Sequence, residues 1–209
     1  MISKELKYTL AVFENKIADR YQKHEQTFDL ESFHGRFHIL RCLLLADCIH
    51  QYYEVKVLDL DIQQSYYAIL FHDIMREGNG IDLWESQSAK DCFTFLKQKG
   101  YPKEYAFQTS KIILKTNDFN LEEQVLYDVD VLDYHRFFFL PQERHLFDDF
   151  KLKFAGPNDV SNHLDIEARK KIILLAEQLV RCSETLPVSI STNELIKIVL
   201  DYYLQIKPW

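Results

Sequence analysis

The sequence predicts an all-α protein, a multi-helix bundle in one domain. The 209-residue chain has only 5 Gly and 5 Pro, whereas a β-sandwich or barrel needs frequent turns rich in these residues. Leu, Ile, Lys, Glu and Gln, which favour helices, are plentiful. A chain of this length buries roughly 70% of the surface of its unfolded form in one core. We therefore expect residues 1–209 to form a single helical domain.

Helices are expected in the first part of the chain at 5–22, 34–52, 59–76, 84–99 and 103–115. In the first segment, apolar side chains from Leu6 to Tyr21 recur at spacings of three and four, which is the stripe of an amphipathic helix. The second is apolar nearly all round, so it is expected at the centre of the core. Gly78-Asn79-Gly80 is expected to close the third segment and Gly100-Tyr101-Pro102 to separate the last two, since Gly and then Pro end helices.

Further helices are expected at 121–140, 142–155 and 164–182, and a terminal one opens at Thr192. Asn120 is the predicted N-cap of the first of these. Its aromatic run, residues 137–139, is expected in the core or at an oligomer contact. The segment 186–191 has the composition of a short strand, but an isolated strand has nothing to pair with, so a connector is expected.

Charge and hydropathy exclude several classes of protein. The net charge of -7 argues against a general nucleic-acid binder, because binding to a phosphate backbone depends on clustered Lys and Arg. The N-terminal segment mixes charged and apolar side chains, unlike a signal peptide, and no later stretch reaches the ~18 uncharged apolar residues of a membrane span. The cysteines form no C-x-x-C motif and mostly lie within apolar helical patterns. We expect reduced core thiols in a cytoplasmic protein with no membrane partner.

The candidate metal-binding and catalytic residues fall in three motifs. These are residues 34–38 with Arg41, residues 71–73 and residues 128–133. His72 and Asp73 end an apolar run, and a buried Asp beside a His needs a cation, which a metal ion supplies. Imidazoles suit transition metals, and carboxylates add the charge that holds a divalent ion. Consecutive helical side chains point about 100° apart, so the pair can share an ion only in a groove between helices. The helices of His38 and Asp130 are the expected neighbours.

The order and spacing of these motifs resemble the HD superfamily of metal-dependent phosphohydrolases, whose members share an all-helical bundle. The matching patterns are H-x-x-x-H-x-x-R from His34, L-F-H-D from Leu70 and D-x-D-x-L-D from Asp128. Residues 76–82 and 85–89 also look like the loop and the E-x-x-S-A helix start of many members. The resemblance implies an HD metal-site core at about 30–140, with the C-terminal helices of 142–209 packed on it. The implied metal ligands are His38, His72, Asp73 and Asp130.

The resemblance also implies how many ions bind and which residues assist them. Members with two or three metals carry further histidines where this chain has Trp84 and residues 112–115, so one divalent ion is expected. The expected ion is a transition metal (Mn, Fe, Co or Ni), with Mg as the alternative. As in the cyclic-nucleotide phosphodiesterases, His34 would donate a proton to the leaving oxygen. Glu77 and Glu85 are the two candidates for orienting the attacking water. The expected substrate-binding residues are Arg41, Arg76 and Asp133.

The expected function is hydrolysis of a phosphate ester or anhydride, with a nucleotide as the small-molecule substrate and a metal-activated water as the nucleophile. Arg41 would offset phosphate charge, but it is equally expected to pair with an acid inside the bundle. One alternative, suggested by His34, is a cyclic nucleotide or cyclic oligonucleotide phosphodiesterase. Another is a non-catalytic ligand-binding or scaffolding module, because the second-metal histidines are missing. Residues 137–140, which include three phenylalanines, and the aromatic C-terminus are possible contact surfaces of a homo-oligomer.

Overall fold

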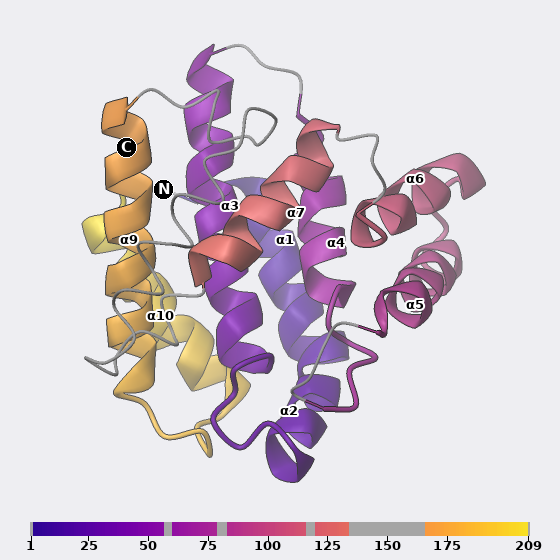
Figure 1. Ribbon diagram of the computed structural model, residues 1–209, viewed down its shortest axis with the longest axis horizontal. Coiled ribbons are helices and arrows are strands. Elements are labelled where there is room, and N and C mark those ends of the chain that lie inside the picture. Colours follow the sequence, from indigo (N-terminus) through magenta and orange to yellow (C-terminus); the bar gives the residue numbers. More distant parts are fainter. Residues whose placement is uncertain (1, 57–59, 79–82, 116–119, 134–165, 209) are drawn as a thin grey trace.

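The computed structural model describes residues 2–56, 60–78, 83–115, 120–133 and 166–208, and every regular element within these ranges is a helix. Figure 1 shows α9 and α10 at the left edge, α5 and α6 at the right edge, and α3, α4 and α7 between them. The all-α prediction is therefore confirmed. The expected helix 142–155 and the aromatic run 137–139 lie outside the described residues.

The N-terminal helical region is longer than expected and is interrupted by a π-helical turn. It consists of α1 (Lys4–Val12), η1 (Phe13–Ile17) and α2 (Ala18–Thr27), where 5–22 was expected. The Ser3 side chain caps α1 by accepting from the Leu6 amide. The apolar side chains that form the expected stripe, from Leu6 to Tyr21, are all buried. The Tyr21 hydroxyl donates to the Leu70 carbonyl, which joins this region to α4.

The two central helices differ from the expectation at the ends that matter for the site. Helix α3 (Arg36–Lys56) begins after His34, so His34 lies in the bend before the helix instead of on its face. Helix α4 (Ile62–Phe71) ends at Phe71, and His72 and Asp73 lie in the turn that follows. In that turn the Ile74 amide donates to the Phe71 carbonyl, which is the tighter hydrogen bonding of a helix end. The helix therefore stops well before Gly78.

A buried carboxylate fixes the start of α3. Glu25 of α2 accepts hydrogen bonds from the Ser32 hydroxyl and from the backbone and side chain of Arg36. The Arg36 guanidinium in turn donates to the carbonyls of Val188 and Ile190. This network leaves no room for a side chain at Gly35, where an added Cβ would lie 2.4 Å from the Ser32 hydroxyl oxygen and 2.5 Å from a Glu25 carboxylate oxygen. The sharp entry into α3 therefore depends on a glycine there.

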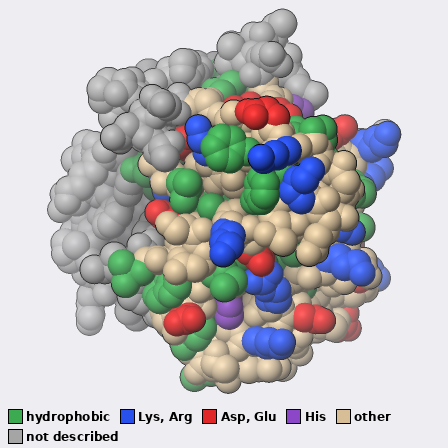
Figure 2. Space-filling view, turned by 90° about the vertical axis from the view of Figure 1, so that its right-hand side faces the viewer, with side chains coloured by type: hydrophobic (Ala, Val, Ile, Leu, Met, Phe, Trp, Pro, Cys, Tyr) green, Lys and Arg blue, Asp and Glu red, His purple; other side chains and the backbone are tan. Residues whose placement is uncertain are grey.

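Two helices form a hairpin on one side of the bundle and a third closes the centre. Helices α5 (Glu85–Gln98) and α6 (Lys103–Ile113) pack against each other and against α4, and Gly100 ends α5 with a φ of 86°. Helix α7 (Leu121–Leu132) is capped by the Asn120 side chain as predicted, and it crosses both α3 and α4. Figure 2 shows that basic, acidic and hydrophobic side chains are interspersed on the face of the molecule that turns toward the right of Figure 1.

The C-terminal helices pack on the opposite side of α3. They are α9 (Ile166–Glu184) and α10 (Thr192–Ile206), close to the expected bounds. Residues 186–191 between them form a connector without a strand, which agrees with the expectation. Ser191 caps α10 by accepting from the Glu194 amide. Of the four expected core thiols, Cys42, Cys48 and Cys92 are buried, whereas Cys182 is only partly buried, and all four are free of disulfides. Within the described ranges, none of the helices is both long enough and apolar enough to cross a membrane.

Candidate metal centre

The structure brings the predicted metal ligands together from three separate elements. His38 lies on α3, His72 and Asp73 lie in the turn after α4, and Asp130 lies on α7. The Nε2 atoms of His38 and His72 are 3.1 Å apart. An oxygen of Asp73 lies 3.8 Å from the His38 Nε2 atom and 3.5 Å from that of His72. An oxygen of Asp130 lies 3.6 Å from the first nitrogen and 4.0 Å from the second.

Hydrogen bonds on the far side of each imidazole set its orientation. The Nδ1 atom of His72 lies 2.9 Å from the Ile69 carbonyl oxygen, and that of His38 lies 2.7 Å from an Asp133 carboxylate oxygen. A carbonyl or a carboxylate can only accept, so both Nδ1 atoms donate, and in the neutral tautomer both Nε2 atoms then carry lone pairs. Two nitrogen lone pairs that face each other at 3.1 Å repel unless a metal ion, or a proton on one of the rings, lies between them. His38, His72 and Asp73 form a group that could hold a metal ion.

A second group of donors, His38, Cys42 and Asp133, also lies within the reach of one ion. Both oxygens of Asp133 already accept from Arg41, at 2.6 Å from Nε and 2.9 Å from a terminal nitrogen. The Cys42 sulfur is buried and lies 3.6 Å from the His38 Nδ1 atom. An ion on this side would have to displace the hydrogen bond that orients His38. The group that contains His72 is therefore the better candidate.

Arg41 and Asp133, both expected to contact substrate, form a buried ion pair behind His38. Arg41 is 2% exposed and Asp133 is fully buried. Arg41 also donates to the Ser183 hydroxyl of α9. Burial would lower the pKa of the Arg41 guanidinium, but the Asp133 carboxylate outweighs burial and raises it, so the guanidinium stays charged. Of the two roles left open for Arg41, this geometry favours pairing with an acid inside the bundle.

Asp73 is held in its charged form by the groups around it. One of its oxygens lies 3.1 Å from His34 Nδ1 and the other accepts from Arg76 Nε. Burial would raise the pKa of the Asp73 carboxyl, but His72 and His34 outweigh burial and hold this pKa well below its usual range. The Arg76 guanidinium also lies over the Trp84 ring, 5.4 Å from its centroid. His34 and Arg76 thus both reach the centre through Asp73.

Lys115 is a residue of the centre that the sequence analysis missed. Its Nζ atom lies 3.6 Å from an Asp130 oxygen and 3.3 Å from a Glu85 oxygen. Burial would lower the pKa of Lys115, but the charges of Asp130 and Glu85 outweigh burial and raise it. Burial would raise the pKa of Asp130, but the charges of His72 and Lys115 outweigh burial and lower it. Lys115 follows the end of α6 with a left-handed φ of 48°, which a lysine seldom adopts. Only its position just after a helix could have drawn attention to it in the sequence.

The two candidate water-orienting carboxylates lie in different surroundings. Glu77 is exposed beyond the turn that carries Asp73. Glu85, the first residue of α5, is half-buried and reaches Asp130 through Lys115. This placement favours Glu85.

Comparisons of the chain with protein-family models, with curated proteins and with solved structures give no match in any of the three. Function is therefore inferred from the geometry and chemistry of these residues alone.

Proposed function

We propose that this protein is a metal-dependent phosphohydrolase of the HD type that hydrolyses a phosphate ester or anhydride of a nucleotide. One observation carries the proposal: the Nε2 atoms of His38 and His72 lie 3.1 Å apart, with the carboxylates of Asp73 and Asp130 within 4.0 Å of one or both of them. Two imidazoles and two carboxylates are a mixed N and O donor set, which suits Mn, Fe, Co or Ni and, less well, Mg.

A divalent ion in such a site acts as a Lewis acid toward a phosphoryl oxygen and lowers the pKa of a bound water. The remaining chemistry belongs to the side chains around it. Lys115 places a positive charge beside Asp130, on the side of the centre that also carries Glu85. There it can neutralise charge on a bound phosphate while Glu85 accepts a hydrogen bond from the attacking water.

His34 is suited to protonate the leaving oxygen. It lies 3.1 Å from the Asp73 carboxylate, on an oxygen that also faces His38 and His72. A carboxylate oxygen can only accept, so the His34 Nδ1 atom donates to Asp73, and this hydrogen bond holds the ring beside the centre. The same placement favours a cyclic-nucleotide phosphodiesterase as the second candidate, since that reaction also needs a proton for the leaving oxygen.

A panel of nucleotides and cyclic nucleotides tests the proposal, each assayed with Mn, Mg, Co and Ni. Phosphate release and product analysis are the measurements, and we expect metal-dependent turnover of at least one compound. His72→Ala should abolish it, whereas Asp201→Ala, an exposed position on α10, should not. Products that retain the phosphate after ring opening would favour the phosphodiesterase. Stoichiometric metal binding without turnover of any compound would contradict catalysis and favour a ligand-binding module.

A further inference from the structure

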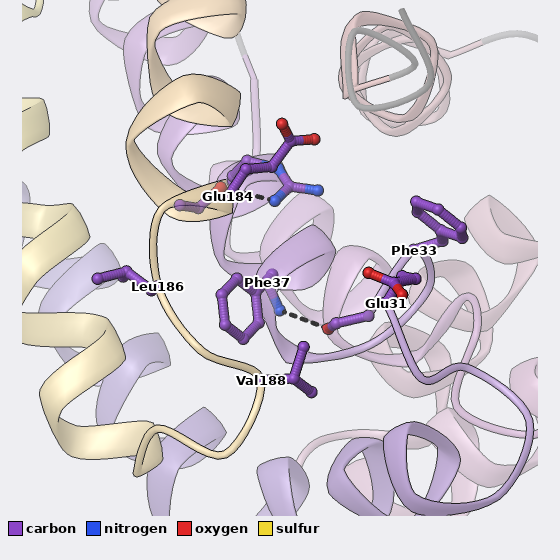
Figure 3. A pocket seen from close by; sticks show the side chains of 9 residues that line it. Glu31, Phe33, Phe37, Glu184, Leu186 and Val188 are labelled. Atoms are coloured by element: carbon purple, nitrogen blue, oxygen red, sulfur yellow. Dashed lines mark hydrogen bonds between the residues drawn. The ribbon is translucent and has the colours of Figure 1, made fainter. Parts of the chain in front are cut away.

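A cavity of about 300 Å³ opens between the loop before α3, the first turns of α3 and the end of α9. Figure 3 shows Glu31 and Phe33 on the loop before α3, Phe37 on α3, and Leu186 and Val188 on the connector after α9. Its volume lies at the lower limit of small-molecule pockets, about 300–1,000 Å³, and suits a single flat ring system. The complete lining is Glu31, Ser32, Phe33, Phe37, Arg41, Ser183, Glu184, Leu186 and Val188.

This cavity lies directly alongside the metal centre. Phe33 and Phe37 line it, and the next residues in the chain, His34 and His38, belong to the centre. Neighbouring Cα atoms are only about 3.8 Å apart. Arg41 lines the cavity as well, and it donates to the same carboxylate that holds the His38 imidazole. The cavity therefore adjoins the centre on the side of the Arg41–Asp133 pair.

The lining selects a particular ligand chemistry. Phe33 and Phe37 offer aromatic rings, against which a flat base can stack. Glu31 and Glu184 are exposed at the rim and bring carboxylates that only accept hydrogen bonds when ionised. Burial raises the pKa of the Glu184 carboxyl to about 7, so this group is fully ionised only above neutral pH. The positive charge of Arg41 is already paired inside the protein, at 2.6 Å from a carboxylate oxygen. The cavity therefore favours a flat ring with N–H donors on its edge and disfavours one with carbonyl oxygens there.

We infer that this cavity binds the amino-bearing heteroaromatic base of the nucleotide whose phosphate reacts at the metal centre. The inference rests on the proposed function and names its substrate class, a nucleotide with an exocyclic amino group. Such an amino group donates to a rim carboxylate. A carbonyl oxygen in its place would face that carboxylate with like partial charge.

The test measures binding of nucleosides to the full chain in the absence of metal, by isothermal titration calorimetry. Two matched pairs serve as probes, adenosine with inosine and cytidine with uridine, because each pair differs by an amino group against a carbonyl. We expect at least one amino nucleoside to bind about tenfold or more tightly than its partner, as a charged hydrogen bond contributes. Glu184→Ala and Phe33→Ala should weaken this binding, whereas Glu167→Ala on the same helix, where the side chain is 70% exposed, should not.

Equal binding within both pairs, no binding of any nucleoside, or unchanged binding in both variants would overturn the inference. These outcomes are separable from failure of the proposed function. If amino nucleosides bind selectively but no nucleotide is hydrolysed, the catalytic proposal fails and the base site stands. If nucleotides are hydrolysed but no nucleoside binds, the base site fails alone. Circular dichroism of each variant establishes that the helical fold is kept.

Discussion

The Nδ1 atom of His38 on α3 donates over 2.7 Å to a carboxylate oxygen of Asp133, the residue that follows α7. The same carboxylate accepts two hydrogen bonds from Arg41. Arg41, on the helix of His38, thereby holds the group that orients His38 toward His72. Partners of this kind fix the ring orientation and tautomer of a metal-binding histidine. The buried ion pair is thus part of the centre even though it lies behind the ligands.

Replacing Arg41 should lower both stability and metal affinity. Arg41→Met leaves Asp133 buried without its cation, and breaking a buried pair in this way costs about 3–5 kcal/mol of unfolding free energy. Loss of a partner behind a ligand typically weakens metal binding about 10–100-fold. Urea unfolding and metal titration measure the two effects. Arg181→Met, an exposed arginine of α9, serves as the control and should change neither.

A double variant separates the two effects. Arg41→Met combined with Asp133→Leu removes both charges, so much of the lost stability should return. Metal affinity should stay low, because the His38 Nδ1 atom then loses its carboxylate acceptor and keeps the Cys42 sulfur, a weak acceptor, at 3.6 Å. A single Arg41→Met variant with wild-type metal affinity would contradict the orienting role.

The predicted ligand set leads to a direct test by metal analysis. The purified protein should take up about one divalent ion per chain after reconstitution with Mn, Fe, Co or Ni, because two imidazoles and two carboxylates make one mixed site. His72→Ala and Asp73→Ala should each abolish uptake and keep the helical fold, whereas Asp201→Ala should bind normally. Full occupancy in Asp73→Ala would show that the ligand assignment is wrong.

Sequence reasoning identified the residues of the centre better than the backbone that carries them. His38, His72, Asp73 and Asp130 were recognisable because each sits in a short motif and the motifs occur in a defined order. The apolar period also placed most helices near their observed bounds. Helix ends were less predictable, and α4 stops at Phe71 where the pattern suggested a longer helix. The apolar run continues past that point because the turn after α4 is itself buried.

Contacts between distant segments were beyond the reach of the sequence. Whether Arg41 pairs with an acid or meets substrate depends on Asp133, the residue that follows α7. Lys115 follows α6 in a left-handed conformation, and its side chain lies against Asp130, a residue of α7. The π-helical turn within the N-terminal helix likewise leaves no local signal, since its residues keep the apolar stripe. Each of these features is set by tertiary packing.

The close packing around Gly35 gives a prediction about stability. Gly35→Ala places a methyl group against Ser32 and Glu25, so the network at the start of α3 must shift. Overpacking of this kind costs about 1–3 kcal/mol. Gly78→Ala is the matched control, because a Cβ there meets nothing within 4 Å. Thermal and urea unfolding of both variants measure the difference, and equal stability of the two would show that the loop before α3 adapts freely.

Lys115 should contribute to substrate binding more than to metal binding. Lys115→Met removes the positive charge beside Asp130 and Glu85, so an anionic substrate should bind more weakly. A charged hydrogen bond is worth about 10–100-fold in affinity, which should appear mainly as a higher KM. Lys111→Met, on α6 with its ammonium over the Phe107 ring, is the control. A wild-type KM in Lys115→Met would remove the residue from the substrate site.

The last prediction separates His34 from His38, whose ring centroids are 6.1 Å apart although only His38 lies on α3. His38→Ala should remove metal and activity together, because its Nε2 atom faces His72. His34→Asn should keep the metal and slow the protonation of the leaving oxygen, since His34 touches the centre through Asp73. General acid catalysis is typically worth ~10²–10⁴-fold, so kcat should fall within that range.

The defect of His34→Asn should depend on the leaving group. A nitrophenolate needs little protonation, so the loss of kcat should shrink for a nitrophenyl phosphate ester compared with a nucleotide. The experiment measures kcat on both substrates and metal content on the same samples. Equal losses on both substrates with metal retained would remove the acid role and leave His34 as a positioning residue for Asp73. Loss of metal would instead make His34 a ligand, because its Nδ1 atom shares the Asp73 oxygen that lies nearest to His72.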